Sequence, residues 1–314
     1  METAAARDPA GSMDLGHHEL DYLAQAHWHH FQYRTGEMIG LDRGRREVLV
    51  GSVVEENGTE VTPARGYGYD TLVLAVGSLT NDFGTPGVAE HAICLETPDQ
   101  AARFHGRLVN ACLRAQSQNE PLRPGQLQVA IIGAGATGVE LAAELHKSTR
   151  ELVAFGLDRI DPDRDITLHL VEAADRILPA LPERIAKAAT DLLTGLGVKV
   201  YTSARVAAVV PNGVKLADGR IIAAELVVWA AGVKAPAFLH NLDGLETNET
   251  NQLVVRQTLQ TTRDDDIFAI GDCAACPWPE RNATVPPRAQ AAHQQSTHLA
   301  RQLPRKLAGQ RLAP

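Results

Sequence analysis

The sequence predicts an α/β fold in which parallel strands are buried between helices. The 314 residues are 44% hydrophobic but only 4% aromatic, which is typical of buried parallel strands with helices on both faces. An apolar run at 128–132 leads directly into the glycine-rich stretch 133–138, and apolar residues at helical spacing follow at 139–145. Strand, glycine turn and helix in this order form the repeating unit of a doubly wound sheet.

The glycine-rich stretch has the spacing Gly-x-Gly-x-x-Gly. In this pattern Gly133 allows a tight turn, Gly135 lets the backbone approach a pyrophosphate, and Gly138 lets the helix pack closely on the strand. Backbone N–H groups of the first helical turn, including that of Thr137, would face the phosphates. We therefore predict a dinucleotide-binding site. The alternative is a glycine-rich turn that only tightens packing.

Glu172 ends the next predicted strand, residues 166–171. A carboxylate there can accept hydrogen bonds from ribose hydroxyls and repel a 2′-phosphate, which favours NAD over NADP. The usual interval from the glycines to this acid is about 20 residues, whereas Glu172 lies 39 positions after Gly133. Residues 147–165 are expected to extend the helix and then form a surface loop. The alternative for Glu172 is a solvated carboxylate at a strand end.

Three further strands are predicted to end in small residues that could bring backbone close to a ligand, at 69–78, 225–232 and 266–272. Asn212-Gly213 and Asp218-Gly219 separate short apolar runs and predict a three-stranded meander. Its strands are expected at 204–210, 214–217 and 221–228. Two earlier antiparallel strands are expected at 47–54 and 58–62.

Composition excludes several classes of function. The net charge of −8 argues against a nucleic-acid-binding surface. No apolar run reaches membrane-spanning length and the first 20 residues lack a signal-peptide pattern, so a cytoplasmic protein is expected. Cys273 and Cys276 form one C-x-x-C pair without a second pair at metal-ligand spacing. No metal site is predicted.

The order of these motifs resembles that of the two-dinucleotide-binding flavoproteins of the pyridine nucleotide-disulfide oxidoreductase superfamily. Within it the chain is similar to type II NADH dehydrogenases. The most specific segments are 135–145 (GATGVELAAEL), 176–179 (RILP), 228–233 (VWAAGV) and 288–294 (RAQAAHQ), the last of which resembles the family's Ala-Gln-x-Ala-x-Gln motif.

The resemblance implies a Rossmann-like NAD(H)-binding domain, residues 106–237, inserted in an incomplete FAD-binding domain, residues 13–105 and 238–314. Residues 1–12 would be a disordered leader. Residues 1–60 contain no Gly-x-Gly-x-x-Gly motif for the FAD pyrophosphate. About 60 to 70 family residues are therefore expected to be missing at the start, as is a membrane anchor at the end, and the chain is expected to purify with little FAD.

The resemblance also implies the chemistry, which is hydride transfer from NADH to FAD followed by reduction of a quinone, without proton pumping. Glu140 would lie near the nicotinamide, or would only interact with the helix dipole. Gln290 and Gln294 would lie on the quinone side. Cofactor contacts would come from small or polar residues after the predicted strands and at the start of the last helix: Ala75, Gly77, Gly232, Gly271, Asp272, Ala289 and Gln290.

Two alternatives remain open on the sequence. One is an NADH-dependent ferredoxin or rubredoxin reductase on the same fold, and the other is an inactive product that binds NADH only. The resemblance further implies peripheral contact with the cytoplasmic face of the inner membrane and allows a homodimer.

Overall fold

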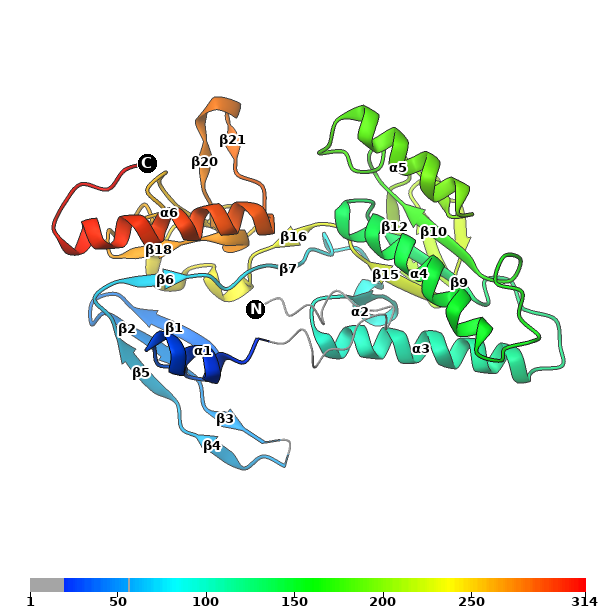
Figure 1. Ribbon diagram of the computed structural model, residues 1–314, viewed down its shortest axis with the longest axis horizontal. Helices are drawn as coiled ribbons and strands as arrows, with labels where there is room; N and C mark the ends of the chain where they lie inside the picture. Colours follow the sequence, from blue (N-terminus) through cyan, green and yellow to red (C-terminus); the bar gives the residue numbers. More distant parts are fainter. Residues whose placement is uncertain (1–19, 56) are drawn as a thin grey trace. The chain divides into compact units, whose positions relative to one another are not determined.

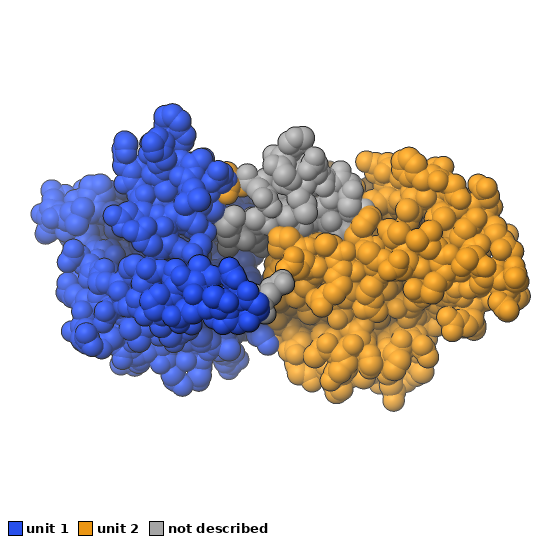
Figure 2. Space-filling view, turned by 90° about the horizontal axis from the view of Figure 1, so that it is seen from below, with its two compact units in different colours: residues 1, 21–79, 233–314 blue, residues 2–20, 80–232 orange. Residues whose placement is uncertain are grey.

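The computed structural model describes residues 20–55 and 57–314 (Figure 1). The chain divides into two compact units (Figure 2). Unit 1 comprises Asp21–Leu79 and Val233–Pro314, and unit 2 comprises Thr80–Gly232. The expected leader, residues 1–12, lies outside the described residues. The functional domain boundaries expected after 105 and after 237 stay a prediction.

Unit 2 contains a five-stranded parallel sheet with the order β11-β10-β9-β15-β8. Three long helices belong to it, and α3 begins with Thr97 as N-cap and Pro98 in the first turn. The elements of this unit's α/β part are β8 (Ile93–Cys94), α3 (Pro98–Ser117), β9 (Gln128–Ile132), α4 (Ala136–Ala154), β10 (Thr167–Val171), α5 (Glu183–Gly195), β11 (Lys199–Tyr201) and β15 (Leu226–Trp229), with the short α2 (Val88–His91) before them.

The two faces of this sheet are covered differently. Helices α3, α4 and α5 lie over one face (Figure 1). There Phe104, Leu145 and Leu193 share a core with the strands. On the other face the cover is the antiparallel meander, whose Val209 and Val214 share a second core with the strands. The expectation of helices on both faces is therefore wrong, because the apolar side of the meander takes the place of a helical layer.

The meander consists of β12 (Val206–Val210), β13 (Gly213–Leu216) and β14 (Ile221–Ala223). Its second turn contains Gly219 at φ +90°, as the Asp-Gly cue predicts. Its first turn is formed by residues 211–212, and Gly213, at φ +141°, is already the first residue of β13 and pairs with Val210. The third expected run, 221–228, is divided. Its second half forms part of β15, which pairs with β9 in the parallel sheet.

Unit 1 combines small sheets around one core in which Leu253, Ile267 and Phe268 are fully buried. One sheet is antiparallel and has the strand order β1-β2-β5. A second sheet consists of β6 and β18, which are parallel. The elements are α1 (Tyr22–His29), β1 (Met38–Asp42), β2 (Glu47–Val50), β3 (Val53–Val54), β4 (Glu60–Thr62), β5 (Arg65–Gly68), β6 (Leu72–Leu74), β7 (Leu79–Thr80), β16 (Val233–Lys234), η3 (Ala237–Leu239), η4 (Leu242–Gly244), β17 (Leu253–Val254), β18 (Ile267–Ala269), η5 (Gly271–Cys273), β19 (Ala274–Ala275), β20 (Pro277–Trp278), η6 (Pro279–Arg281), β21 (Ala283–Thr284) and α6 (Ala289–Leu307).

The expected strand 47–54 is interrupted at Gly51. Its first part, β2, joins the three-stranded sheet, whereas its second part, β3, forms a hairpin with β4.

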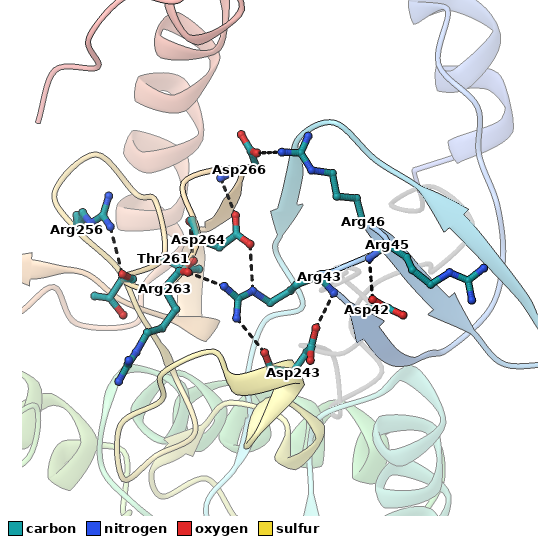
Figure 3. Close-up of polar contacts among 11 residues, drawn as sticks. Asp42, Arg43, Arg45, Arg46, Asp243, Arg256, Thr261, Arg263, Asp264 and Asp266 are labelled. Carbon is teal, nitrogen blue, oxygen red and sulfur yellow. Dashed lines mark hydrogen bonds and ion pairs between the residues drawn. The ribbon is translucent and has the colours of Figure 1, made fainter.

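The turn after β1 is attached to the C-terminal segment of unit 1 through Arg43 (Figure 3). The backbone N–H of Arg43 donates to the Asp243 carboxylate at 2.5 Å, and its Nε donates to the Asp264 carboxylate at 3.0 Å. Its Nη1 and Nη2 donate to the carbonyls of Asp243 and Arg263 at 3.1 and 2.5 Å. The planar guanidinium of Arg43 thus joins the turn after β1 to residues 243–264, about 200 positions later in the sequence. Lysine cannot reproduce this geometry.

His169 is a buried titratable residue in the middle of β10, with only 4% of its surface exposed. Its Nε2 lies 2.8 Å from Gln128 Oε1, and its Nδ1 lies 3.3 Å from the Tyr201 hydroxyl. Burial, with a smaller effect of the Lys199 charge, lowers the pKa of His169 from its ordinary value of 6.5 to about 4. The imidazole is therefore neutral in the folded chain at neutral pH.

We expect unit 2 to lose stability as the pH falls from 7 to 5. Between these values His169 becomes protonated in the unfolded chain but stays neutral in the folded chain. Protonation therefore favours the unfolded state and lowers the unfolding free energy by about 2 kcal/mol. Urea denaturation at both pH values measures the loss. His169→Gln should remove about that part of the pH dependence, whereas His29→Gln, at an exposed position, should not. An unchanged pH dependence in His169→Gln would contradict the assignment.

Across residues 20–55 and 57–314, no helix combines the length and apolarity needed to cross a membrane. Within the same residues, no group of three or more His, Cys, Asp or Glu side chains is arranged to hold a metal ion.

Candidate functional site

The glycine turn between β9 and α4 has the close approaches that the spacing predicts. Gly133 has φ +98°, and a Cβ there would lie 2.7 Å from the Ala231 Cα, two residues after the end of the neighbouring β15. A Cβ on Gly138 would lie 1.9 Å from the Gly133 carbonyl oxygen. Both glycines are buried. Only glycine fits either position without moving backbone.

Gly135 differs from its two neighbours in the motif. It is exposed, and a Cβ added to it would meet no atom within 4 Å. Gly135 is the N-cap of α4, and no side chain caps this helix end. The N–H groups of the first turn, including that of the exposed Thr137, therefore have no side-chain acceptor. An open, uncapped helix start after a glycine turn is a suitable site for a phosphate.

The loop after β10 forms hydrogen bonds with both the backbone N–H and the backbone carbonyl of Ala134, which lies between Gly133 and Gly135. The Glu172 carboxylate accepts the N–H of Ala134 at 2.7 Å through Oε2 and that of Ala174 at 2.9 Å through Oε1. The N–H of Leu178 donates to the Ala134 carbonyl at 2.8 Å. Leu178 has φ +48°, an uncommon backbone conformation for leucine.

Glu172 therefore lies at the end of β10 beside the glycine turn, where the sequence predicts it. The sequence did not indicate that it also shapes this turn, nor that Leu178 takes part. A positive φ at a leucine leaves no signal in composition or spacing. Glu172 is half-buried, and a carboxylate has about four lone-pair sites, so it retains capacity for further donors.

Two other predicted residues of unit 2 lie near the ends of these elements. Glu140 is exposed in the early part of α4, and its carboxylate forms no hydrogen bond or ion pair with the residues that the structure describes. Gly232 follows β15 at φ +67°, and its carbonyl accepts the N–H of Asn81 at 3.2 Å. Gly232 is thus adjacent to Ala231, against which Gly133 packs.

In unit 1 the expected flavin residues follow two paired strands. Ala75 and Gly77 come after β6, and Gly271 and Asp272 come after β18. Because β6 and β18 are parallel neighbours, their carboxyl ends lie together. The Ser78 hydroxyl joins the two segments by donating to the Asp272 carboxylate at 2.8 Å.

A second contact holds the backbone of the Asp272 turn. Gln252 Nε2 donates to the Asp272 carbonyl at 2.8 Å. Gly77, at φ +71°, is half-buried, and a Cβ there would meet no atom within 4 Å, so this turn leaves open space for a ligand.

Helix α6 presents the expected glutamines at its start. Ala289, Gln290 and Gln294 are exposed, and no side chain caps the helix. The glutamine that contacts the Gly271 turn is a different one, since Gln295 Oε1 accepts the Gly271 N–H at 2.7 Å. Ser78, Gln252 and Gln295 were not identified from the sequence, because their partners lie many residues away.

The C-x-x-C pair lies beside this turn. Cys273 and Cys276 are buried thiols, not joined in a disulfide. Burial raises the pKa of both, which keeps them protonated at neutral pH. The Cys273 thiol donates to the Ile270 carbonyl at 3.3 Å.

With this geometry established, the comparison with known proteins is specific. The family model described as pyridine nucleotide-disulphide oxidoreductase matches residues 4–296. A type II NADH:quinone oxidoreductase of Haemophilus influenzae is 41% identical over 306 residues, covering 93% of this chain and 68% of that protein. The chain belongs to the pyridine nucleotide-disulphide oxidoreductases, among the type II NADH:quinone oxidoreductases.

Other relatives of this flavoenzyme family are matched over less of their length. The Mycobacterium tuberculosis type II NADH:quinone oxidoreductase Ndh is 29% identical over 77% of this chain, which spans only 52% of that protein. The structure of NDH2 from Plasmodium falciparum in complex with NADH superimposes with a TM-score of 0.74 at 18% identity, over 87% of this chain and 68% of that one. This likeness supports the two-dinucleotide-binding flavoprotein fold.

Proposed function

We propose that this chain carries the NADH:quinone oxidoreductase activity of its family. In the net reaction NADH and one proton reduce a quinone to the quinol and leave NAD⁺. The observation that carries the proposal is the open glycine turn with Glu172 beside it, in a chain 41% identical to a type II NADH:quinone oxidoreductase. Steady-state oxidation of NADH with a short-chain quinone, with FAD added, tests it.

Unit 2 would bind NADH. The N–H groups at the start of α4 would receive the pyrophosphate, with Gly135 leaving room for it. Glu172 would accept the adenosine ribose hydroxyls and disfavour a 2′-phosphate, so NADH should bind more tightly than NADPH. Glu140 would lie toward the nicotinamide, and Gly232 would contact the nucleotide through its backbone.

Unit 1 would hold FAD through the turns after β6 and β18. The open space at Gly77 and the carboxylate of Asp272, oriented by Ser78, fit the polar ribityl region of a flavin. The backbone of Ala75, Gly271 and Ala289 would complete this site. When bound, FAD supplies the two-electron chemistry that links NADH to the quinone. The residues of unit 1 would position the flavin and hydrogen-bond its polar atoms.

Gln290 and Gln294 would serve the quinone, since both amides are exposed on one face of α6. We expect Gln290→Leu and Gln294→Leu each to lower kcat/KM for the quinone about tenfold, by removing a hydrogen bond to a quinone carbonyl. Flavin reduction by NADH should change less than twofold. Steady-state turnover and stopped-flow flavin reduction separate these effects.

A matched control for this experiment is Gln310→Leu, at an exposed position after α6. It should leave both measurements unchanged. If both helix variants kept quinone turnover, or slowed flavin reduction equally, α6 would not be the quinone side.

The proposed quinone substrate is lipid-soluble, which makes peripheral membrane contact part of the proposal. Arg301, Arg305 and Arg311 are exposed near the end of α6 and would favour an anionic surface such as the inner membrane's cytoplasmic face. A homodimer also stays a prediction.

A further inference from the structure

Arg176 is an unusual cation in the loop after β10. It is half-buried, and its Nη2 donates to the Pro179 carbonyl at 3.1 Å. Its Nε is buried without any hydrogen-bond partner. Within the described residues it pairs with no carboxylate. A half-buried guanidinium with an unsatisfied N–H and no counter-charge is costly.

The other arginines of unit 2 do not share this combination. Arg150, which is also half-buried, pairs with Asp163. Those that lack a carboxylate partner among the described residues are all exposed to solvent, where hydration offsets the charge: Arg103, Arg107, Arg123, Arg159, Arg184 and Arg205. Arg176 is therefore the one described arginine of this unit that is withdrawn from solvent without a counter-charge.

The position of Arg176 indicates which group could supply the negative charge that its guanidinium lacks. The loop that carries it is closed onto Ala134 of the glycine turn from both sides, by Glu172 before it and by Leu178 after it. Arg176 lies between these two anchors in sequence. The segments that meet at this turn are 133–138, 172–178 and 230–232, and Arg176 is the only lysine or arginine in them.

A dinucleotide pyrophosphate carries two negative charges. The first turn of α4 offers backbone N–H groups and a helix dipole equivalent to about half a positive charge, which leaves most of that charge uncompensated. A guanidinium with N–H groups to spare is suited to a phosphate because it donates two parallel hydrogen bonds.

We propose that Arg176 binds the adenosine-side phosphate of the nucleotide. This inference rests on the proposed binding of NADH to unit 2 and adds a residue outside the glycine motif to that site. Glu172 and Arg176, four positions apart, would then bind different groups of the adenosine half of NADH. The carboxylate receives the ribose and the guanidinium receives the 5′-phosphate.

Calorimetric titration of the full chain with ADP-ribose, 5′-AMP and adenosine tests this assignment without requiring flavin or quinone. Arg176→Met should weaken ADP-ribose and 5′-AMP by about tenfold, the usual size of one charge-assisted contact. It should leave adenosine, which has no phosphate, within twofold. Arg176→Lys should lie between the wild type and Arg176→Met. Arg107→Met removes an exposed arginine of the same unit and should change none of the three.

The proposal is overturned if Arg176→Met weakens adenosine as much as 5′-AMP, because that pattern indicates a general loss of loop structure. It is also overturned if 5′-AMP is unaffected while adenosine 2′,5′-bisphosphate weakens, because Arg176 would then face the 2′ position. Wild-type chain that binds none of the three ligands would refute the proposed NADH site itself, whereas normal wild-type binding with an unchanged Arg176→Met refutes only this inference.

Discussion

Gly135→Val should abolish NADH binding while leaving the fold intact. A side chain at Gly135 meets no protein atom within 4 Å, and the backbone there has φ −69°, which every residue tolerates. The unfolding free energy should therefore change by less than about 1 kcal/mol. The same side chain would occupy the space through which a pyrophosphate approaches α4, so the affinity for NADH should fall more than about a hundredfold, a loss of over 2.7 kcal/mol.

Calorimetry with NADH and urea denaturation measure the two quantities. Gly106→Val is the matched control, because Gly106 belongs to the same unit and its Cβ position is also open. It should bind NADH normally. Gly133→Val offers the opposite contrast, since its Cβ would lie 2.7 Å from the Ala231 backbone, and should fail to fold. NADH binding within twofold of wild type in Gly135→Val would remove the phosphate site from this turn.

Glu172→Ala should weaken NADH roughly a hundredfold and reduce the preference for NADH over NADPH. The substitution removes the acceptor of the ribose hydroxyls and the charge that opposes a 2′-phosphate. It also leaves the N–H groups of Ala134 and Ala174 without their acceptor. The unfolding free energy should therefore fall by about 2 kcal/mol as well.

Titrations with both nucleotides separate the two effects, because a loosened turn weakens NADH and NADPH alike whereas a lost ribose contact changes their ratio. Asp191→Ala is the control. Asp191 is an exposed carboxylate of unit 2 paired only with Lys187 four residues before it, and its loss should change neither affinity nor stability by more than about 0.5 kcal/mol. A nucleotide preference that survives Glu172→Ala unchanged would assign the discrimination to another residue.

The parts of the fold that the sequence predicted depend on local chemistry. Gly133 and Gly219 have the positive φ that their turns require, and each turn lies between runs whose periodicity already indicates a strand or a helix. The expectation of helices on the second face of the parallel sheet is wrong. Val209 and Val214 of the meander cover that face. An apolar side chain in a short strand does not indicate by itself which neighbouring element it will pack against.

The candidate site divides in the same way. The glycines were identified by the spacing of their motif, and Glu172 by its place at the end of the next predicted strand. Gln295 and Ser78 were missed because their partners, Gly271 and Asp272, are 24 and 194 residues away. Such contacts depend on the tertiary packing of the chain. The residues next to Gln295 or Ser78 in the sequence therefore do not indicate which distant residue each side chain contacts.

The most direct test of the NADH:quinone oxidoreductase assignment is an anaerobic stoichiometry measurement. Protein whose visible absorbance confirms bound FAD is mixed with NADH and excess short-chain quinone, and both substrates are followed to completion. The account predicts one quinone reduced for each NADH oxidised, with no turnover in Gly135→Val. NADH oxidation that proceeds equally without quinone, or quinone left unreduced by FAD-loaded protein, would contradict it.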